Sequence, residues 1–140
     1  MTKINSTTVT VLVGLKTVRA MRGITAEAVM KIVERGELKF VFNLASPGCR
    51  KLRALRFWLP EVVDPRAVAK LKIETVVSMI LPRESRSISC SEICKRFTVC
   101  RPTVHRWRVE CGGVIKNRVL YIERDALAKW LRRRWIGGGK

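Results

Sequence analysis

The sequence of 140 residues has few of the side chains that catalyse reactions, since it contains one histidine and 11 scattered acidic residues. General acid–base catalysis needs titratable groups held close together, and such a pair is hard to assemble from so few. The sequence also lacks the GxxxxGK[ST] phosphate-binding loop, the HExxH zinc motif and the GxSxG hydrolase turn. We therefore expect no enzymatic activity, no cofactor and no small-molecule substrate.

Long apolar runs are absent as well. No window approaches the roughly 18 apolar residues of a membrane-spanning helix. The N-terminal run MTKINSTTVTVLVG has no apolar segment of the length found in secretory signal peptides. We expect no membrane partner and no export, which leaves the cytoplasm as the default location.

The cysteine count is odd, which argues against a closed disulfide framework and suits a reducing compartment. The five cysteines are Cys49, Cys90, Cys94, Cys100 and Cys111. Their spacing, taken with His105, matches neither paired CxxC knuckles nor a zinc finger, so we expect no metal. A metal or redox sensor stays an alternative, because Cys100 lies beside Arg101 at a predicted helix start, where the pKa of a thiol is expected to fall.

Positive charge is what the chain has in excess. Its 29 Lys and Arg residues give a formal net charge of +18 and a pI near 10.9, and 47% of the residues are hydrophobic, enough for a packed core. Residues 1–66 carry +7, residues 67–84 carry +1 and residues 85–140 carry +10. A pI above about 9 is typical of nucleic-acid-binding proteins. A solvated basic surface or attraction to anionic lipid is the alternative, but no basic amphipathic helix dominates the sequence.

One pattern occurs twice in the chain. Residues 25–59 read TAEAVMKIVERGELKFVFNLASPGCRKLRALRFWL, and residues 101–122 read RPTVHRWRVECGGVIKNRVLYI. Each predicts a short helix that ends at glycine, then a strand, a polar turn and a second strand. A small helical segment precedes each copy. A repeat of this length predicts two similar structural units.

The first half is predicted to contain two helices and three strands. Thr25 is a suitable N-cap, and Gly23 and Gly36 are typical of residues that follow a helix. The predicted elements are a strand at 6–13, helices at 15–22 and 25–35, and strands at 38–44 and 55–59.

The middle and the second half are predicted in the same way. Residues 66–81 have apolar positions near helical spacing and predict a connecting helix, which a polar linker at 82–87 follows. Ser89 and Glu92 have capping-box spacing, and Asn117-Arg118 predicts a tight hairpin turn. The predicted elements of the second half are helices at 89–97 and 102–111, strands at 114–116 and 119–123, and a final helix opened by Asp125.

Residues 91–131, SEICKRFTVCRPTVHRWRVECGGVIKNRVLYIERDALAKWL, resemble the excisionase-like and MerR-like winged helix-turn-helix family. Its usual run has a Ser-Glu-opened helix, a V-S-R-x-T-V-x-R-W recognition segment, a glycine, a hairpin wing and R-D-A-L-x-x-W-L. The first half resembles it more loosely, through VERGELKFVF and LRFWLP. The resemblance implies an α+β, mostly helical fold. It would comprise a winged helix-turn-helix domain at 1–65, a connecting helix and linker at 66–84, and a second such domain at 85–140.

This family places the second helix of the motif in the major groove of double-stranded DNA. On the predicted helix 102–111, Val104, Trp107 and Cys111 share an apolar face and Arg106 lies opposite. Arg106 suits a bidentate contact to guanine, with His105 or Thr103 reaching a neighbouring base, and a phosphate contact is the alternative for Arg106. The DNA contacts expected in the second half are Arg101, Thr103, His105, Arg106, Arg108, Lys116, Asn117, Arg118, Arg132 and Arg133. Trp130 and Trp135, which flank the last two, are expected in the core.

The first half predicts different chemistry. Its helix at 25–35 has an outward face of Glu27, Met30, Lys31 and Glu34, opposite the buried Val29, Ile32 and Val33. Because the phosphates of DNA repel carboxylates, this helix is a poor reader of the major groove. Basic side chains gather in the hairpin instead, where we expect phosphate or minor-groove contacts, with a solvated hairpin tip as the alternative. They are Arg50, Lys51, Arg53 and Arg56.

These features predict a nucleoid-associated DNA-binding protein of the cytoplasm. An excisionase-type recombination factor or a transcriptional regulator of a mobile element fits its size and charge. A recombinase or a second copy of the chain is a further candidate partner. The main alternative treats the first half as a protein-interaction or dimerisation module.

Overall fold

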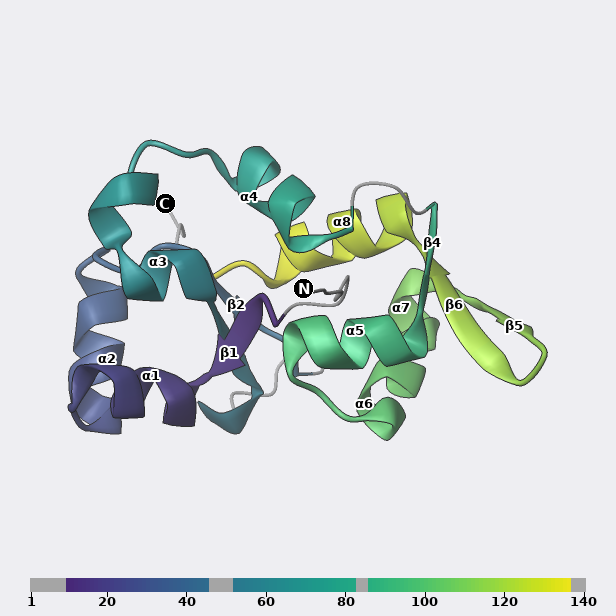
Figure 1. Cartoon of the computed structure of the whole chain (residues 1–140), viewed down its shortest axis with the longest axis horizontal. Coiled ribbons are helices and arrows are strands. Elements are labelled where there is room, and N and C mark those ends of the chain that lie inside the picture. Colours follow the sequence, from purple (N-terminus) through teal and green to yellow (C-terminus); the bar gives the residue numbers. More distant parts are fainter. Residues whose placement is uncertain (1–9, 46–51, 83–85, 137–140) are drawn as a thin grey trace, which may run out of the picture.

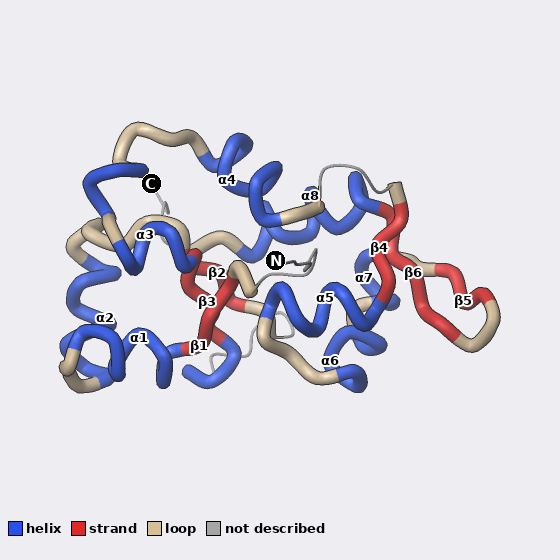
Figure 2. The backbone as a smooth tube through the Cα atoms, in the orientation of Figure 1, coloured by secondary structure: helices blue, strands red, loops and turns tan. Residues whose placement is uncertain are grey.

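The computed structural model describes residues 10–45, 52–82 and 86–136, apart from the side chain of Arg53. Figures 1 and 2 show two small antiparallel sheets with helices packed around them, which confirms the α+β class. The first sheet has the order β1 (Leu12–Gly14), β3 (Leu55–Trp58), β2 (Val41–Asn43), and the second has the order β4 (Ser87–Ser89), β6 (Val119–Glu123), β5 (Val114–Lys116). In both, the strand that comes last in the sequence lies in the middle.

Each sheet belongs to one copy of the same series of elements, which runs strand, helices, hairpin, closing helix. The first repeat adds α1 (Leu15–Arg22), α2 (Ala26–Glu34), a 3-10 turn (Leu52–Ala54) and α3 (Leu59–Val63) to its sheet. The second repeat adds α5 (Cys90–Phe97), α6 (Arg101–Arg106), α7 (Arg108–Cys111) and α8 (Arg124–Arg134). A 3-10 turn (Pro65–Val68) and α4 (Ile73–Ile80) connect them. The twofold pattern of the sequence is therefore present in the backbone topology.

Short-range sequence signals form as predicted. The Thr25 hydroxyl accepts a hydrogen bond from the Ala28 N–H at 3.2 Å, and Gly23 ends α1 in the left-handed conformation at φ 64°. The Ser89 hydroxyl accepts from the Glu92 N–H at 3.3 Å at the start of α5. Asn117 and Arg118 both have positive φ, 51° and 67°, as the two central residues of a type I′ hairpin turn require.

The connecting helix predicted at 66–81 is wrong at its start. The segment makes a single 3-10 turn, and α4 begins only at Ile73. Val68 and Leu71 pack against the core, and the Ala69 carbonyl accepts a hydrogen bond from Lys39 Nζ at 2.6 Å. These contacts with the core and with Lys39 hold the segment in a path that a continuous helix would not follow.

The strand predicted at 38–44 is also shorter than expected, and α3 was not predicted. The N–H groups of Lys39 and Phe40 donate to the carboxylate of Glu61 on α3, at 2.9 and 2.8 Å. Because these donors bind a side chain and not a neighbouring strand, regular pairing of β2 begins at Val41. Glu61 is only 2% exposed, so an acidic residue forms part of the interior here.

One hydrophobic core runs through both repeats. It extends from Phe42 and Trp58 of the first sheet, through α4, to Phe97 and Trp130 of the second repeat. A smaller cluster around Val29 belongs to the first repeat alone. The division of the chain at residues 65 and 84 stays a prediction, because a shared core shows how the parts pack and not whether each folds alone.

The end of α8 joins the two repeats a second time. Trp135 forms an isolated bridge with Phe42 of β2, and the Ile136 N–H donates to the Val41 carbonyl at 2.9 Å. The Trp135 indole N–H donates to the Lys39 carbonyl at 2.7 Å, and its ring stacks on Phe40. The last described residues thus extend the first sheet, which fixes the repeats relative to each other.

Candidate nucleic-acid interface

The helices α5 and α6 meet at a tight turn in the second repeat. Thr98 adopts the left-handed conformation at φ 56°, which ends α5 and redirects the chain. Val104 and Trp107 are buried, and the Trp107 ring lies 4.3 Å from that of Trp130 and 6.0 Å from that of Phe97, centre to centre. The predicted apolar face of this segment is therefore confirmed at these two positions.

The predicted single helix 102–111 is wrong, because it breaks into α6 and α7 at Trp107. The Trp107 N–H donates to the Val104 carbonyl, and the Glu110 N–H donates to the Trp107 carbonyl, both at 3.0 Å. These bonds have the tighter spacing of a 3-10 turn. The turn lets the indole stay packed on Trp130 while the chain continues into α7.

The outward side of α6 is open to solvent. Arg101, Pro102 and Arg106 are exposed, and Thr103 and His105 are half-buried. On α7, Arg108 is exposed. The structure thus brings together five of the predicted DNA contacts around α6 and α7, namely Arg101, Thr103, His105, Arg106 and Arg108.

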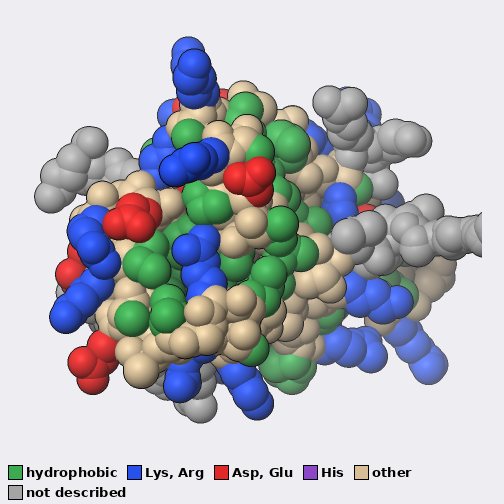
Figure 3. Space-filling view, turned by 60° about the vertical axis from the view of Figure 1, so that its left-hand side comes forward, with side chains coloured by type: hydrophobic (Ala, Val, Ile, Leu, Met, Phe, Trp, Pro, Cys, Tyr) green, Lys and Arg blue, Asp and Glu red, His purple; other side chains and the backbone are tan. Residues whose placement is uncertain are grey.

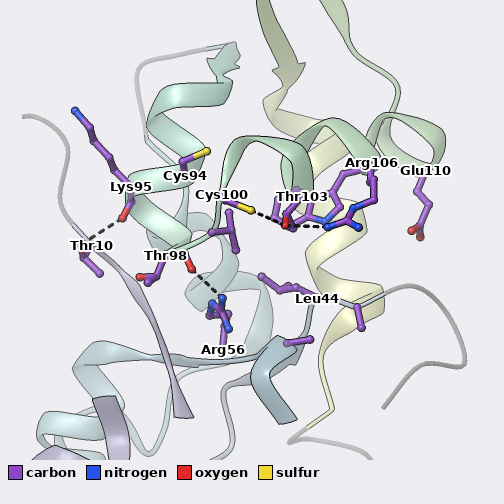
Figure 4. Close-up of a pocket in the computed structure, with 14 residues that line it drawn as sticks. Thr10, Leu44, Arg56, Cys94, Lys95, Thr98, Cys100, Thr103, Arg106 and Glu110 are labelled. Carbon is purple, nitrogen blue, oxygen red and sulfur yellow. Dashed lines mark hydrogen bonds between the residues drawn. The ribbon is translucent and has the colours of Figure 1, made fainter. Parts of the chain in front are cut away.

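Two side chains of α6 and its N-cap residue, Cys100, form a hydrogen-bonded chain that sequence reasoning missed (Figure 4). Arg106 Nη2 donates to the Thr103 hydroxyl at 3.2 Å, and that oxygen lies 3.1 Å from Cys100 Sγ. Their spacing of three residues, which places side chains on one helix face, was the signal available. The bond holds the Arg106 guanidinium at the exposed surface of α6.

The Thr103 hydrogen bonds lower the pKa of the exposed Cys100 thiol, and the Arg106 charge adds a smaller effect in the same direction. The predicted direction is confirmed, although its main cause is Thr103 and not Arg101. Burial instead raises the pKa of Cys94 to about 11 and that of Cys111 to about 12.

We therefore expect Cys100 to react with iodoacetamide several times faster than Cys94 or Cys111 near pH 8, because the thiolate is the nucleophile. Thr103→Val should move the midpoint of its pH–rate profile upward. Peptide mass spectrometry after timed alkylation measures each site. Equal rates at Cys100 and Cys111 would contradict the lowered pKa of the Cys100 thiol.

The hairpin of β5 and β6 carries a second group of predicted contacts. Lys116, Asn117 and Arg118 are exposed at its tip, which extends away from the body of the molecule (Figure 1). Val114 and Ile115 of the same hairpin are also exposed.

The arginines at the end of α8 point to different places. Arg132 Nη2 lies 2.5 Å from the Glu74 carboxylate of α4, and Figure 1 shows α4 and α6 on opposite sides of α8. Arg133 is exposed, and its charge reaches Cys111 of α7. The structure therefore pairs Arg132 with α4 and leaves Arg133 exposed to solvent. Trp130 is fully buried and Trp135 half-buried, as the core interpretation expected.

The predicted contacts of the first hairpin are only partly visible. Arg50 and Lys51 lie outside the described residues, as does the side chain of Arg53. Arg56 is half-buried on β3, and its guanidinium donates to the carbonyls of Phe97 and Thr98 in the second repeat, at 3.0 and 2.8 Å. Burial lowers the pKa of Arg56. The structure thus directs Arg56 toward the α5–α6 turn.

The outward face of α2 is acidic and basic in alternation. Glu27, Lys31 and Glu34 are exposed as predicted, but Met30 is not outward, because it is half-buried against the core of the first repeat. Figure 3 shows acidic side chains among basic ones on the face toward the first repeat.

An open groove of about 810 Å³ lies between the two repeats beside α6. Leu44, Ala54 and Arg56 line it from the first repeat, and Lys95, Thr103 and Arg106 line it from the second (Figure 4). Its walls carry more basic than acidic groups, Glu110 being the acidic one.

The described part of the chain contains neither a metal-binding cluster nor a membrane-spanning helix. Within it, no three His, Cys, Asp or Glu side chains are placed to hold a metal ion. None of its helices combines the length and the apolarity needed to cross a membrane.

Comparisons of the chain with known proteins found no similar protein. No family model matches the chain, and neither the curated proteins nor the solved structures give a significant match.

Proposed function

We propose that the protein binds double-stranded DNA and that α6 of the second repeat reads the base sequence. One observation carries the proposal: a short helix whose inner face is fixed by buried Val104 and Trp107 presents Arg101 and Arg106 to solvent. The chain has a formal net charge of +18. DNA carries about one negative charge per 1.7 Å of its axis, so this surface is electrostatically complementary to it.

Each exposed side chain has a role that its chemistry suggests. Arg106 offers the bidentate donor pair that fits guanine O6 and N7, and Thr103 or His105 would meet a neighbouring base. Arg101 and Arg108 flank α6 and suit phosphate oxygens. Lys116, Asn117 and Arg118 at the tip of the hairpin would contact the adjacent backbone or minor groove, as the wing of such a protein does.

In this proposal the two repeats are tandem winged helix-turn-helix units. Their shared strand order and element series support it. An excisionase-type recombination factor or a regulator of a mobile element is the biological role that we favour. A recombinase or a second copy of the chain remains a candidate partner.

The test begins with duplexes that the wild-type protein selects from a random 30-base-pair pool. Arg106→Ala is expected to weaken binding to the selected duplex by about 1–3 kcal/mol and to relax the preference at one base position. Arg118→Gln should weaken binding to every duplex equally and reduce the slope of log Kd against log salt by about 1. Fluorescence anisotropy at several salt concentrations measures both.

Lys70→Gln is the matched control. Lys70 is exposed in the segment that connects the repeats, and its substitution changes the net charge as Arg118→Gln does. We expect it to leave the selected sequence and the salt slope unchanged. Equal losses in all three variants would indicate attraction by net charge alone, and no enrichment from the random pool would exclude base readout.

A further inference from the structure

The first repeat packs directly on the turn that joins α5 and α6. Three of its side-chain or backbone groups donate to carbonyls at the end of α5: the Thr10 hydroxyl to Lys95 at 3.3 Å, the Val11 N–H to Arg96 at 2.8 Å, and Arg56 Nε to Phe97 at 3.0 Å. Arg56 Nη2 also donates to the next carbonyl, that of Thr98, at 2.8 Å.

These contacts complete the capping of a helix. The last four carbonyls of an α-helix have no partner within it. In α5 these belong to residues 94–97, and the Cys94 carbonyl accepts from the N–H groups of Thr98 and Val99. The other three accept from the first repeat. Arg56 also places a positive charge at the negative end of the helix dipole.

The turn residue itself depends on the first repeat. Thr98 is a β-branched residue with φ 56°, a conformation that such residues adopt only where surrounding contacts enforce it. Its hydroxyl donates to the Leu12 carbonyl of β1 at 2.7 Å. This bond and the Arg56 bond hold Thr98 from two sides, and Thr98 sets the direction in which α6 leaves.

Among the described residues, the bonds at the matching turn of the first repeat do not come from the second repeat. In the corresponding turn of the first repeat, the Arg19 carbonyl accepts from the N–H groups of Gly23 and Ile24, and Arg22 Nη2 donates to the Val62 carbonyl at 3.2 Å. All of these partners belong to the first repeat.

We infer that the first repeat is an intramolecular brace for the α5–α6 turn, and that Arg56 is a positioning residue for α6 rather than a DNA contact. The part of this inference that concerns DNA rests on the proposed function. In this inference the first repeat has its partner in the same chain. This explains why it keeps the fold although the exposed face of α2 carries two carboxylates and one lysine. Arg56 is suited to the role because its planar guanidinium reaches two successive carbonyls, which a lysine ammonium cannot match.

The first measurement needs no DNA. Amide hydrogen exchange by NMR at 10 °C is compared in wild type, Arg56→Met and Arg22→Met, each shown to be folded by near-ultraviolet circular dichroism. Arg22→Met is the control, because it removes an arginine–carbonyl bond within the first repeat. Arg56→Met should speed exchange at the end of α5 and in α6 by about tenfold or more, with α2 unchanged. Unchanged α6 exchange would overturn the brace, whether or not the protein binds DNA.

The second measurement compares affinity for the selected duplex with that for a scrambled duplex. Arg56→Met should reduce this ratio by about tenfold, the discrimination carried by one well-placed base contact, without changing the salt slope. Arg56→Lys should recover part of the ratio, and Arg22→Met should preserve it. Arg101→Gln should reduce the slope by about 1.

The outcomes separate the two proposals. A fall in salt slope for Arg56→Met equal to that for Arg101→Gln would make Arg56 a phosphate contact and overturn its positioning role. If Arg56→Met lowers the melting temperature but leaves the affinity ratio unchanged, Arg56 only stabilises the fold. That result would also overturn its positioning role. If wild type binds no duplex while Arg56→Met still releases α6, the brace holds and the proposed function fails.

Discussion

Trp130→Ala is expected to lower the free energy of unfolding by about 3–5 kcal/mol, as truncations of large buried aromatic side chains do. Trp130 is fully buried, and its ring contacts that of Trp107 at a centroid distance of 4.3 Å. The Arg134 guanidinium lies over the Trp130 ring, 5.3 Å from its centre. Urea denaturation followed by circular dichroism measures the loss.

Trp130→Phe is the matched control for this prediction. The Trp130 indole N–H is buried and has no hydrogen-bond partner among the residues that the structure describes. Phenylalanine therefore removes a polar group that contributes no bond there, and it keeps most of the apolar ring. We expect it to retain more than half of the stability that alanine loses.

The shape of the unfolding transition tests the shared core. Since Trp130 belongs to the same cluster as Phe42 and Trp58, Trp130→Ala should destabilise both repeats in one transition. Probes in the first sheet and in α8 should give coincident curves. Two separate transitions, with only the second repeat destabilised, would show that the repeats fold independently and contradict this prediction.

The sequence predicted the structure correctly where the contact that determines it is local. Thr25 and Ser89 bond amides three residues away, and the Asn117-Arg118 turn depends on two adjacent backbone conformations. Such contacts form whatever the rest of the chain does, so residue type and spacing predict them. The buried positions of Val104 and Trp107 followed from helical periodicity for the same reason.

The sequence did not predict contacts between a side chain and a residue far away in the chain. Arg56 looks like one of four basic residues in a hairpin, but its guanidinium binds carbonyls 41 and 42 residues away. Trp135 bonds the carbonyl of Lys39, 96 residues earlier. Charge and hydropathy give no information about such partners, because a guanidinium donates to phosphate and to backbone carbonyl oxygens alike. The break at Trp107 was missed because periodicity does not include the fit of one ring against another.

The two repeats therefore differ in what their exposed surfaces can do. The second keeps an open basic helix, and the first uses β1 and β3 for contact with it. Under the proposed function, one DNA-reading helix suffices for the pair of repeats, and the outward face of α2 is then free to carry carboxylates.

Glu61→Ala is expected to lower the free energy of unfolding by about 2–6 kcal/mol, since it leaves two N–H groups without a partner and each such group costs about 1–3 kcal/mol when buried. The Glu61 carboxylate accepts from the N–H groups of Lys39 and Phe40, and both lie where β2 begins. Glu61→Gln should lose roughly half as much, because its amide can accept one of the two bonds. Urea denaturation at pH 7 compares the variants, and exposed Glu27→Gln serves as the control.

The direction of the Glu61 pKa shift determines how the stability of the protein changes with pH. Burial raises the pKa of Glu61, and the two N–H bonds and the charges of Lys39 and Arg22 oppose it only in part. A carboxyl whose pKa is higher in the folded state stabilises the fold fully below its unfolded pKa and loses that contribution as pH rises through the folded pKa. The stability of wild type relative to Glu61→Gln should therefore increase on acidification from pH 7 toward pH 4. A decrease would mean that the hydrogen bonds from Lys39 and Phe40 outweigh burial, so that the folded protein favours the ionised carboxylate.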